Sequence, residues 1–433
     1  MTIAPAEADR RPPVALWFTV AAFTAGVQAV VALFPLYEQA TDLTTTDLTI
    51  VYGCYPIALI PAVLLQGSLS DAVGRRPLVL FGVAVQFIAA LIGMEARTLP
   101  WLILARALQG WSIGALWATS TAWVRDFTPE HRRDDAARLV SATTMGSNAV
   151  GALTFGALGA LTDSIRLPWA VLAGVLLVAG AAVLTIPETV PNRHWPGLSI
   201  RFRRPADAPH FTRFVAPLVV ASMSMGTVAL VMAPSVVDAA SGPSAVWSGA
   251  GLALFLGGGA LIQPFVTSRW APRAVLAISA VAMPFGYVGL IGGSEMGSLT
   301  LALAGMLLTG TGVSLAFCAL LILTERMSTP ANRAAVVAAF SVILYLSQSS
   351  PALVAGVVAD RFGLTTLLVV TGVVASTVII SVFRTPGVEP VDATAAGGHP
   401  AGGFGELNHH RRVGWRPSAS ATRGRRRRAT RGR

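Results

Sequence analysis

The feature that most constrains this chain is a series of apolar blocks, each about 20 residues long, that run from near residue 14 to near residue 383. A helix of that length rises about 30 Å, which matches the hydrocarbon core of a bilayer. Only 12% of the 433 residues are charged, against about 25% in soluble domains. The blocks therefore predict an all-α membrane protein with about twelve transmembrane helices.

The blocks form two sets of six with a polar connector between them. The first set covers 14–36, 47–67, 78–95, 99–124, 138–161 and 167–187. The second set covers 214–238, 245–267, 273–293, 297–323, 334–358 and 363–383. We therefore expect an N-terminal segment at 1–13, six-helix bundles at 14–187 and 214–385, a linker at 188–213 and a basic tail at 386–433.

The arginines predict the orientation in the membrane. All 32 basic residues are Arg, and outside the tail most of them fall in segments on the side of the N-terminus. The loops of the opposite side hold Arg97, Arg166 and Arg361 alone. Because basic residues are enriched in cytoplasmic loops, both termini and the linker are expected in the cytoplasm.

The two charged ends of the chain need separate interpretations. Arg10 and Arg11 precede the first block like the start of an export signal, but the apolar run after Pro13 is too long for a signal core. They are interpreted as a cytoplasmic anchor. The tail, with its run 425–428 of four Arg, has no apolar face and is expected to be disordered. It is either a solvated tail or a clamp for anionic lipid head groups, and nucleic-acid binding is disfavoured.

A first motif, G-S-L-S-D-A-V-G-R-R-P, occupies 67–77 between the second and third blocks. Gly67 allows close helix approach, and Gly74 permits a tight turn. Arg75 and Arg76 hold the loop in the cytoplasm. Asp71 can bind a facing helix N-terminus or a neighbouring Arg, and can release it on protonation. These five residues are therefore candidates for a functional motif; the alternative is an ordinary polar turn.

A second motif, R-A-L-Q-G-W-S-I-G-A, occupies 106–115 in the fourth block. Arg106 within a span costs about 2.5–3.5 kcal/mol on insertion scales, so it should face a polar cavity or a partner. The alternative is that it snorkels to the outer interface. Gln109 is grouped with it as a candidate for the cavity or for proton coupling. Gly110 and Gly114 form a G-x-x-x-G step that favours helix packing.

The fifth block supplies further candidates in the small-residue run 146–156. Gly151 and Gly156 are helix-packing candidates. Asn148 is either a contact to substrate or an interhelical hydrogen bond.

Three more polar residues are candidates for a substrate cavity. The eleventh block is unusually polar around Tyr345 and Gln348, and Pro351 is expected to break or kink it so that freed backbone lines a cavity. Gln28 in the first block is a lone polar residue. Asp47, at the outer end of the second block, is an edge carboxylate that could take part in proton coupling.

The two motifs carry a resemblance to a known family. The run 67–76 resembles the G-x-L-x-D-x-x-G-R-R signature of the major facilitator superfamily, and 106–115 resembles a pattern of its proton-coupled members. There are departures from the family patterns: Ala72 stands where a basic residue is frequent, and Ala152 and Phe155 replace a proline and a glycine of the antiporter motif. The resemblance implies two rocking six-helix bundles, with Asp71 helping to lock the cytoplasmic gate.

The resemblance implies a secondary transporter with proton coupling as its motive force. The large apolar content, the few charges within the spans and the partial antiporter motif favour export of a small neutral or amphipathic molecule. A relay through Arg106 and an edge carboxylate is one hypothesis. Uptake or uniport of a metabolite, a lipid flippase, and a non-transporting sensor or scaffold remain alternatives. No metal-ligand spacing, nucleotide loop or catalytic triad is apparent, so no enzyme, metal or cofactor is expected. The expected partners are the bilayer, a small molecule and protons, around a monomer in the plasma membrane, as in a bacterial inner membrane.

Overall fold

A computed structural model describes residues 12–129, 133–190, 211–328 and 333–384. Within these ranges the chain is helical and contains no β-strand. All of them belong to one compact unit, Met1–Pro390. The predicted tail at 386–433 and most of the predicted linker lie outside the described residues.

The helices follow the apolar blocks closely. The first half contains α1 (Val14–Ala32), α2 (Phe34–Ala40), α3 (Thr45–Val73), α4 (Arg75–Glu95), α5 (Leu99–Asp126), α6 (Arg133–Thr162) and α7 (Arg166–Thr185). The second half contains η2 (Phe211–Val215), α9 (Ala216–Val231), α10 (Ala233–Ser241), α11 (Ala245–Arg269), α12 (Pro272–Glu295), α13 (Leu299–Arg326), α14 (Arg333–Phe362) and α15 (Leu364–Arg384).

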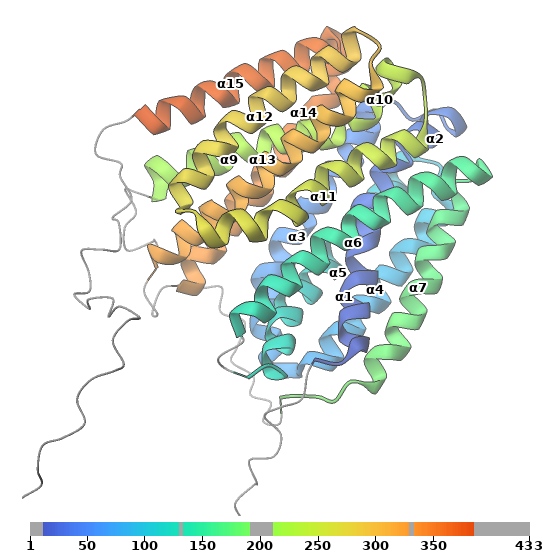
Figure 1. Cartoon of the computed structure of the whole chain (residues 1–433). Helices are drawn as coiled ribbons and strands as arrows, with labels where there is room; N and C mark the ends of the chain where they lie inside the picture. The colour runs from blue at the N-terminus through green and yellow to red at the C-terminus, as the bar shows by residue number, and fades with distance from the viewer. Residues whose placement is uncertain (1–11, 130–132, 191–210, 329–332, 385–433) are drawn as a thin grey trace, which may run out of the picture. The chain divides into compact units, whose positions relative to one another are not determined.

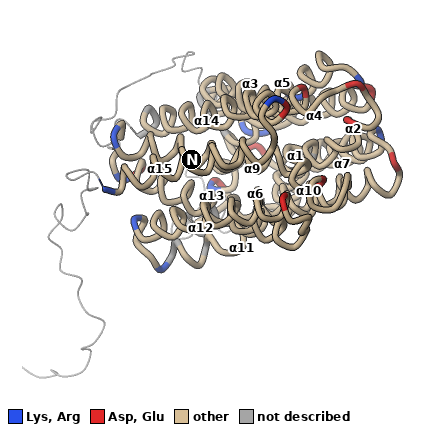
Figure 2. The backbone as a smooth tube through the Cα atoms, turned by 90° about the horizontal axis from the view of Figure 1, so that it is seen from above, with Lys and Arg blue, Asp and Glu red and all other residues tan. Residues whose placement is uncertain are grey.

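Ten of the described helical segments are long and apolar enough to cross a membrane. Two of the predicted spans, α5 and α6, do not reach the same mean hydropathy within the described residues. Arg106 and Gln109 lower the hydropathy of α5, and α6 is rich in Gly, Ser and Thr. Charged residues lie mostly at the ends of the long helices, as Figure 2 shows from above. The chain is thus a multi-pass membrane protein.

The two halves repeat one another at a spacing of 200 residues. The bounds of α5, Leu99–Asp126, and of α13, Leu299–Arg326, differ by 200 in residue number, and the same holds for α6 and α14. The helices α3 and α11 begin 200 residues apart, at Thr45 and Ala245. Transporters are often built from such repeats. Hydropathy alone indicates only a weak repeat, whereas the helix bounds give its register.

The first helix of each half is broken, which differs from the predicted spans 14–36 and 214–238. The breaks lie at Leu33 and Met232, which have φ of −91° and −89°. Each is followed two residues later by a proline, Pro35 or Pro234, near the start of the next short helix. Because proline lacks the N–H that continues a helix, both breaks have the same cause.

The helix α14 is continuous over Pro351, so the expected break is absent. Proline leaves the carbonyl four residues earlier without its helical donor, which here is that of Ser347. The hydroxyl of Ser224 in α9 donates to this carbonyl at 3.4 Å. The freed backbone carbonyl therefore receives a hydrogen bond from a neighbouring helix.

Contacts between the halves are made chiefly by two helix pairs, α3 with α14 and α6 with α11. Figure 1 shows α6 beside α11, and places α2 and α10 at the same end of the molecule. At the interface of α6 with α11, a Cβ added at Gly156 would lie 2.3 Å from the carbonyl oxygen of Ala245. That is closer than real Cβ contacts, so the two backbones touch because Gly156 has no side chain.

Close backbone contact also holds each half together. A Cβ at Gly110 would lie 2.3 Å from the Tyr55 carbonyl oxygen in α3. Its repeat counterpart, Gly310, would place a Cβ 2.0 Å from the Phe255 carbonyl oxygen in α11. A Cβ at Gly114 would meet that of Ala62 at 2.5 Å. Small residues therefore set the spacing between helices in both halves.

The helix α6 offers a matched test of this packing. A Cβ at Gly151 would lie 1.9 Å from the Ala25 carbonyl oxygen of α1, whereas one at Gly146 meets nothing within 4 Å. We expect Gly151→Ala to destabilise the protein by about 1–3 kcal/mol. Gly146→Ala should be neutral or slightly stabilising, since glycine within a helix is unfavourable. Thermal unfolding of the purified variants measures both; equal melting temperatures would contradict the contact.

Candidate transport site

A cavity lies between the two halves. Its walls come from four helices of the first half (α1, α3, α5 and α6) and four of the second half (α9, α11, α13 and α14). The empty space between the lining side chains is about 1020 Å³, including its opening. This is the size range of small-molecule sites. The lining is mainly aliphatic and aromatic, and its described residues include no Asp, Glu or Arg.

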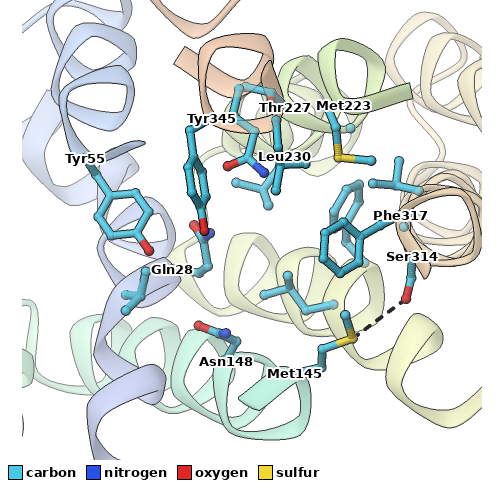
Figure 3. Close-up of a pocket in the computed structure, with 18 of the residues that line it drawn as sticks. Gln28, Tyr55, Met145, Asn148, Met223, Thr227, Leu230, Ser314, Phe317 and Tyr345 are labelled. Atoms are coloured by element: carbon cyan, nitrogen blue, oxygen red, sulfur yellow. Dashed lines mark hydrogen bonds between the residues drawn. The ribbon is translucent and has the colours of Figure 1, made fainter. Parts of the chain in front are cut away.

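The structure brings the four predicted substrate-cavity residues, Gln28, Asn148, Tyr345 and Gln348, to this cavity. Figure 3 shows Gln28, Asn148 and Tyr345 on the same side of it as Tyr55. The Asn148 amide nitrogen donates to the Thr144 carbonyl of its own helix at 3.0 Å. The buried oxygens of Gln28 and Asn148 have no hydrogen-bond partner among the described residues. The cavity therefore offers two unoccupied acceptors.

The other side of the cavity is more apolar and includes methionine side chains. Figure 3 shows Phe317, Met145 and Met223 there, with Ser314 close to the Met145 sulfur. Several lining residues are repeat counterparts, 200 residues apart: Tyr55 with Phe255, Trp117 with Phe317, and Asn148 with Gln348. Sequence reasoning identified the amides and Tyr345 but missed the other aromatic residues, which the 200-residue register aligns.

Arg106 lies one layer behind this wall. Its side chain is 1% exposed, so it does not snorkel to the surface. One guanidinium nitrogen donates to the Val27 carbonyl at 2.7 Å and to the Gln109 side-chain oxygen at 2.8 Å. The guanidinium carbon lies 5.9 Å from the Tyr52 ring centroid and 5.0 Å from that of Tyr55, within cation–π range. The structure thus brings the candidates Arg106 and Gln109 together.

Asp47 is engaged elsewhere. Its carboxylate accepts from the Thr44 backbone and hydroxyl, each at 2.9 Å, in a capping box at the start of α3. This satisfies two donors at the helix N-terminus. Among the residues that the structure describes, no three His, Cys, Asp or Glu side chains gather as metal ligands.

We use "the Arg75 end" for the end of the helices that carries Gly74, Arg75 and Arg76. The backbone N–H groups of Arg75 and Arg76 donate to the carboxylate of Glu188 at 3.1 and 3.0 Å. Glu188 follows α7 in the sequence, and its carboxylate caps the N-terminus of α4. Gly74 has φ +109°, and a Cβ there would lie 2.6 Å from Glu188 Oε2. Only glycine adopts this positive φ and allows this close approach of Glu188 without strain.

Side chains extend this cluster to α5. Arg75 Nε lies 3.4 Å from Asp126 Oδ2, and another of its nitrogens donates to Ser70 Oγ at 2.5 Å. The Thr189 hydroxyl also donates to Asp126, at 2.6 Å. The predicted members Gly67 and Asp71 belong to α3, but their side chains lie outside the described residues. Sequence reasoning missed Glu188 and Asp126, although the Ile-Pro-Glu-Thr ending after α7 is a visible signal.

The opposite end, here "the Thr45 end", joins the two halves tightly. A Cβ at Gly356 of α14 would lie 2.5 Å from Thr46 Cα of α3. The Thr46 hydroxyl donates to Asp360 of α14 at 2.5 Å. Nearer the cavity, a Cβ at Gly53 would meet the Leu353 side chain at 3.0 Å. The halves therefore close against each other at this end.

Glu38 of α2 is a titratable group at the Thr45 end, where the Thr45 hydroxyl donates to it at 2.8 Å. Partial desolvation of its carboxyl group is the main cause that raises its pKa, the hydrogen bond from Thr45 opposes the rise, and the charges of Asp238 and Asp360 add to it. A raised carboxyl pKa means that the folded arrangement favours the protonated form. The arrangement is therefore disfavoured as the pH rises through that pKa.

A bundle of membrane-crossing helices that surrounds a small-molecule cavity from two repeated halves defines a membrane transporter. The chain belongs to the Major Facilitator Superfamily, whose family model matches residues 16–350. Its fold and family are those of transporters rather than enzymes.

Curated relatives include proteins named multidrug resistance protein MdtL. The one from Salmonella paratyphi A is 24% identical over 68% of this chain and 75% of its own length. The one from Klebsiella pneumoniae is 25% identical over 28% of this chain. The chain spans 31% of the Klebsiella relative and 52% of one from Salmonella heidelberg, about a third to a half of their lengths.

Solved structures share the fold. A bacterial homologue of the human lysosomal transporter Spinster, in an inward-facing and occupied conformation, matches with a TM-score of 0.68 at 14% identity. It covers 86% of this chain and 96% of its own. The nucleoside transporter NupG matches with a TM-score of 0.64 at 14% identity, over 86% of this chain and 100% of its own.

The Glu188 cap gives a test at the Arg75 end. We expect Glu188→Ala to lower stability by about 1–2 kcal/mol, since two backbone donors of α4 lose their acceptor. Glu95→Ala is the matched control, because the partner of Glu95 within the described part of the chain is exposed Arg166 at 2.7 Å, and exposed pairs contribute little. Thermal unfolding of both variants gives the comparison. A Glu188→Ala melting temperature equal to that of Glu95→Ala would contradict the cap.

Proposed function

We propose that this protein exports a small neutral or amphipathic molecule across the plasma membrane, driven by protons, through alternating access to the cavity. The observation that carries the proposal is the cavity itself, which is apolar, lined by both halves and closed at the Thr45 end. The MdtL relatives, named for multidrug resistance, support export.

The orientation follows from the arginines. In this proposal α5 and α6 also span the membrane, which gives twelve spans, and both termini lie in the cytoplasm. The Thr45 end then faces outward, and the Arg75 end faces the cytoplasm of a bacterial cell. The protein acts as a monomer, with the two six-helix bundles at 14–187 and 214–385 as its moving parts and 188–213 as the linker.

Proton coupling needs a group that changes charge during the cycle. The cavity lining offers no carboxylate among its described residues, so the carboxylates at the two ends are the candidates. Asp71 is placed by the proposal at the cytoplasmic gate with Arg75 and Arg76. Glu38 is at the outer end, where its protonated form favours the closed arrangement. Arg106 and Gln109 contribute a fixed charge and its partner beside the cavity.

The test is accumulation of a panel of uncharged fluorescent aromatic compounds in cells that express the protein. Wild type should lower accumulation, and an uncoupler should abolish this difference. Asn148→Ala should weaken export about fivefold or more, as expected for one lost hydrogen bond. Thr162→Ala is the control, because among the described residues exposed Thr162 bonds only to Leu158 of its own helix. Export that survives the uncoupler would exclude proton coupling, and unchanged accumulation would exclude export of the panel.

A further inference from the structure

Behind the cavity wall lies a buried charge that has no counter-ion among the described residues. Arg106 is 1% exposed, and the described residues give it hydrogen bonds to Val27 and Gln109 but no carboxylate partner. Two of its guanidinium nitrogens have no hydrogen-bond partner among the described residues. Arginine stays protonated in proteins, so the charge is permanent.

This charge acts on whatever occupies the cavity. The rings of Tyr52 and Tyr55 lie against the Arg106 guanidinium, and both residues line the cavity. In a partly buried site, a positive charge repels a cation that lies one side chain away. This repulsion is enough to weaken binding of the cation about tenfold or more. The described lining includes no acidic residue that would offset this repulsion.

The polar groups of the cavity point to an uncharged partner with hydrogen-bond donors. The side-chain oxygens of Gln28 and Asn148 are buried acceptors without a partner among the described residues. An N–H or O–H group of a neutral molecule satisfies such oxygens. Trp117, Phe317 and Tyr345 provide apolar and aromatic surface for the rest of the molecule.

The internal repeat shows what this position looks like without the charge. The residue 200 positions after Arg106 is Met306, which is 0% exposed in α13. A buried Met therefore fits this helix register in the second half. Both halves pack a buried side chain at this position, but only in the first half is it charged. Replacing Arg106 by Met therefore removes the charge and keeps a side chain that this position accommodates.

We propose that Arg106 sets the charge selectivity of the cavity, which accepts uncharged aromatic molecules that carry N–H or O–H donors and excludes organic cations. Tyr52 and Tyr55 hold the guanidinium beside the cavity, and Gln28 and Asn148 receive the donors. The inference rests on the proposed function only in taking this cavity as the substrate site. It does not depend on the direction of transport or on proton coupling.

Two compounds of the same three-ring shape test the inference. Acridone is uncharged with an N–H donor, and 10-methylacridinium is a permanent cation. Their binding to the purified full-length protein in lipid nanodiscs is measured by equilibrium dialysis, without any gradient. Wild type should bind acridone at least tenfold more tightly than the cation. Arg106→Met should reduce this ratio about tenfold, chiefly by tighter binding of the cation.

Two variants serve as controls. Arg106→Lys keeps the charge and should keep the exclusion, and Arg166→Met removes an exposed charge distant from the cavity lining and should leave the ratio unchanged. If Arg106→Met does not fold, Arg106→Gln removes the same charge and gives the same comparison. Wild type that binds acridone no more tightly than the cation, or a ratio unchanged without the charge, overturns the proposal. A failure of export or of coupling would appear in the accumulation assay alone.

Discussion

The hydrocarbon interior of a bilayer offers no hydrogen-bond partner, and the rest of this structure depends on that constraint. Backbone groups must pair within helices, so each apolar block becomes a helix. Between helices there is no hydrophobic driving force, so close packing has to hold them. Gly110, Gly151 and Gly156 supply it, because each lets a neighbouring carbonyl oxygen approach to a distance that a side chain would forbid. The exception at Pro351 follows the same constraint, since Ser224 satisfies the carbonyl that the proline leaves free.

The two halves share one arrangement of helices, and the proposed function depends on the positions where the halves differ. Helix bounds, broken first helices and glycine contacts recur at a spacing of about 200 residues. The cavity lies between the two halves and is lined by residues that correspond in the repeat, such as Asn148 and Gln348. The pair Arg106 and Met306 breaks the symmetry, with a charge on one side of the cavity only. The Glu188 cap and the pair of Arg75 with Asp126 hold the Arg75 end of the first half together.

Much of this fold could be predicted from the sequence because a lipid solvent makes the helix signal strong. The predicted block 99–124 became Leu99–Asp126, and 363–383 became Leu364–Arg384. The cavity amides were also predictable, because a polar residue within a span needs a partner. The breaks at Leu33 and Met232 were missed, since Pro35 and Pro234 lie in apolar runs that hydropathy treats as continuous. The role of Glu188 was missed because its partners are backbone groups 112 and 113 residues away, which the local Ile-Pro-Glu-Thr pattern does not identify.

Under the proposed alternating access, the two halves must separate at the Thr45 end for the cavity to serve both sides of the membrane. Thr46 and Asp360 are joined there by a hydrogen bond of 2.5 Å. The direct test is a disulfide between Thr46→Cys and Asp360→Cys, in a protein whose Cys54 and Cys318 are replaced by Ala. The account predicts that oxidation abolishes transport and that a reductant restores it, with each single-cysteine variant unaffected. Full transport by the cross-linked protein would contradict the account.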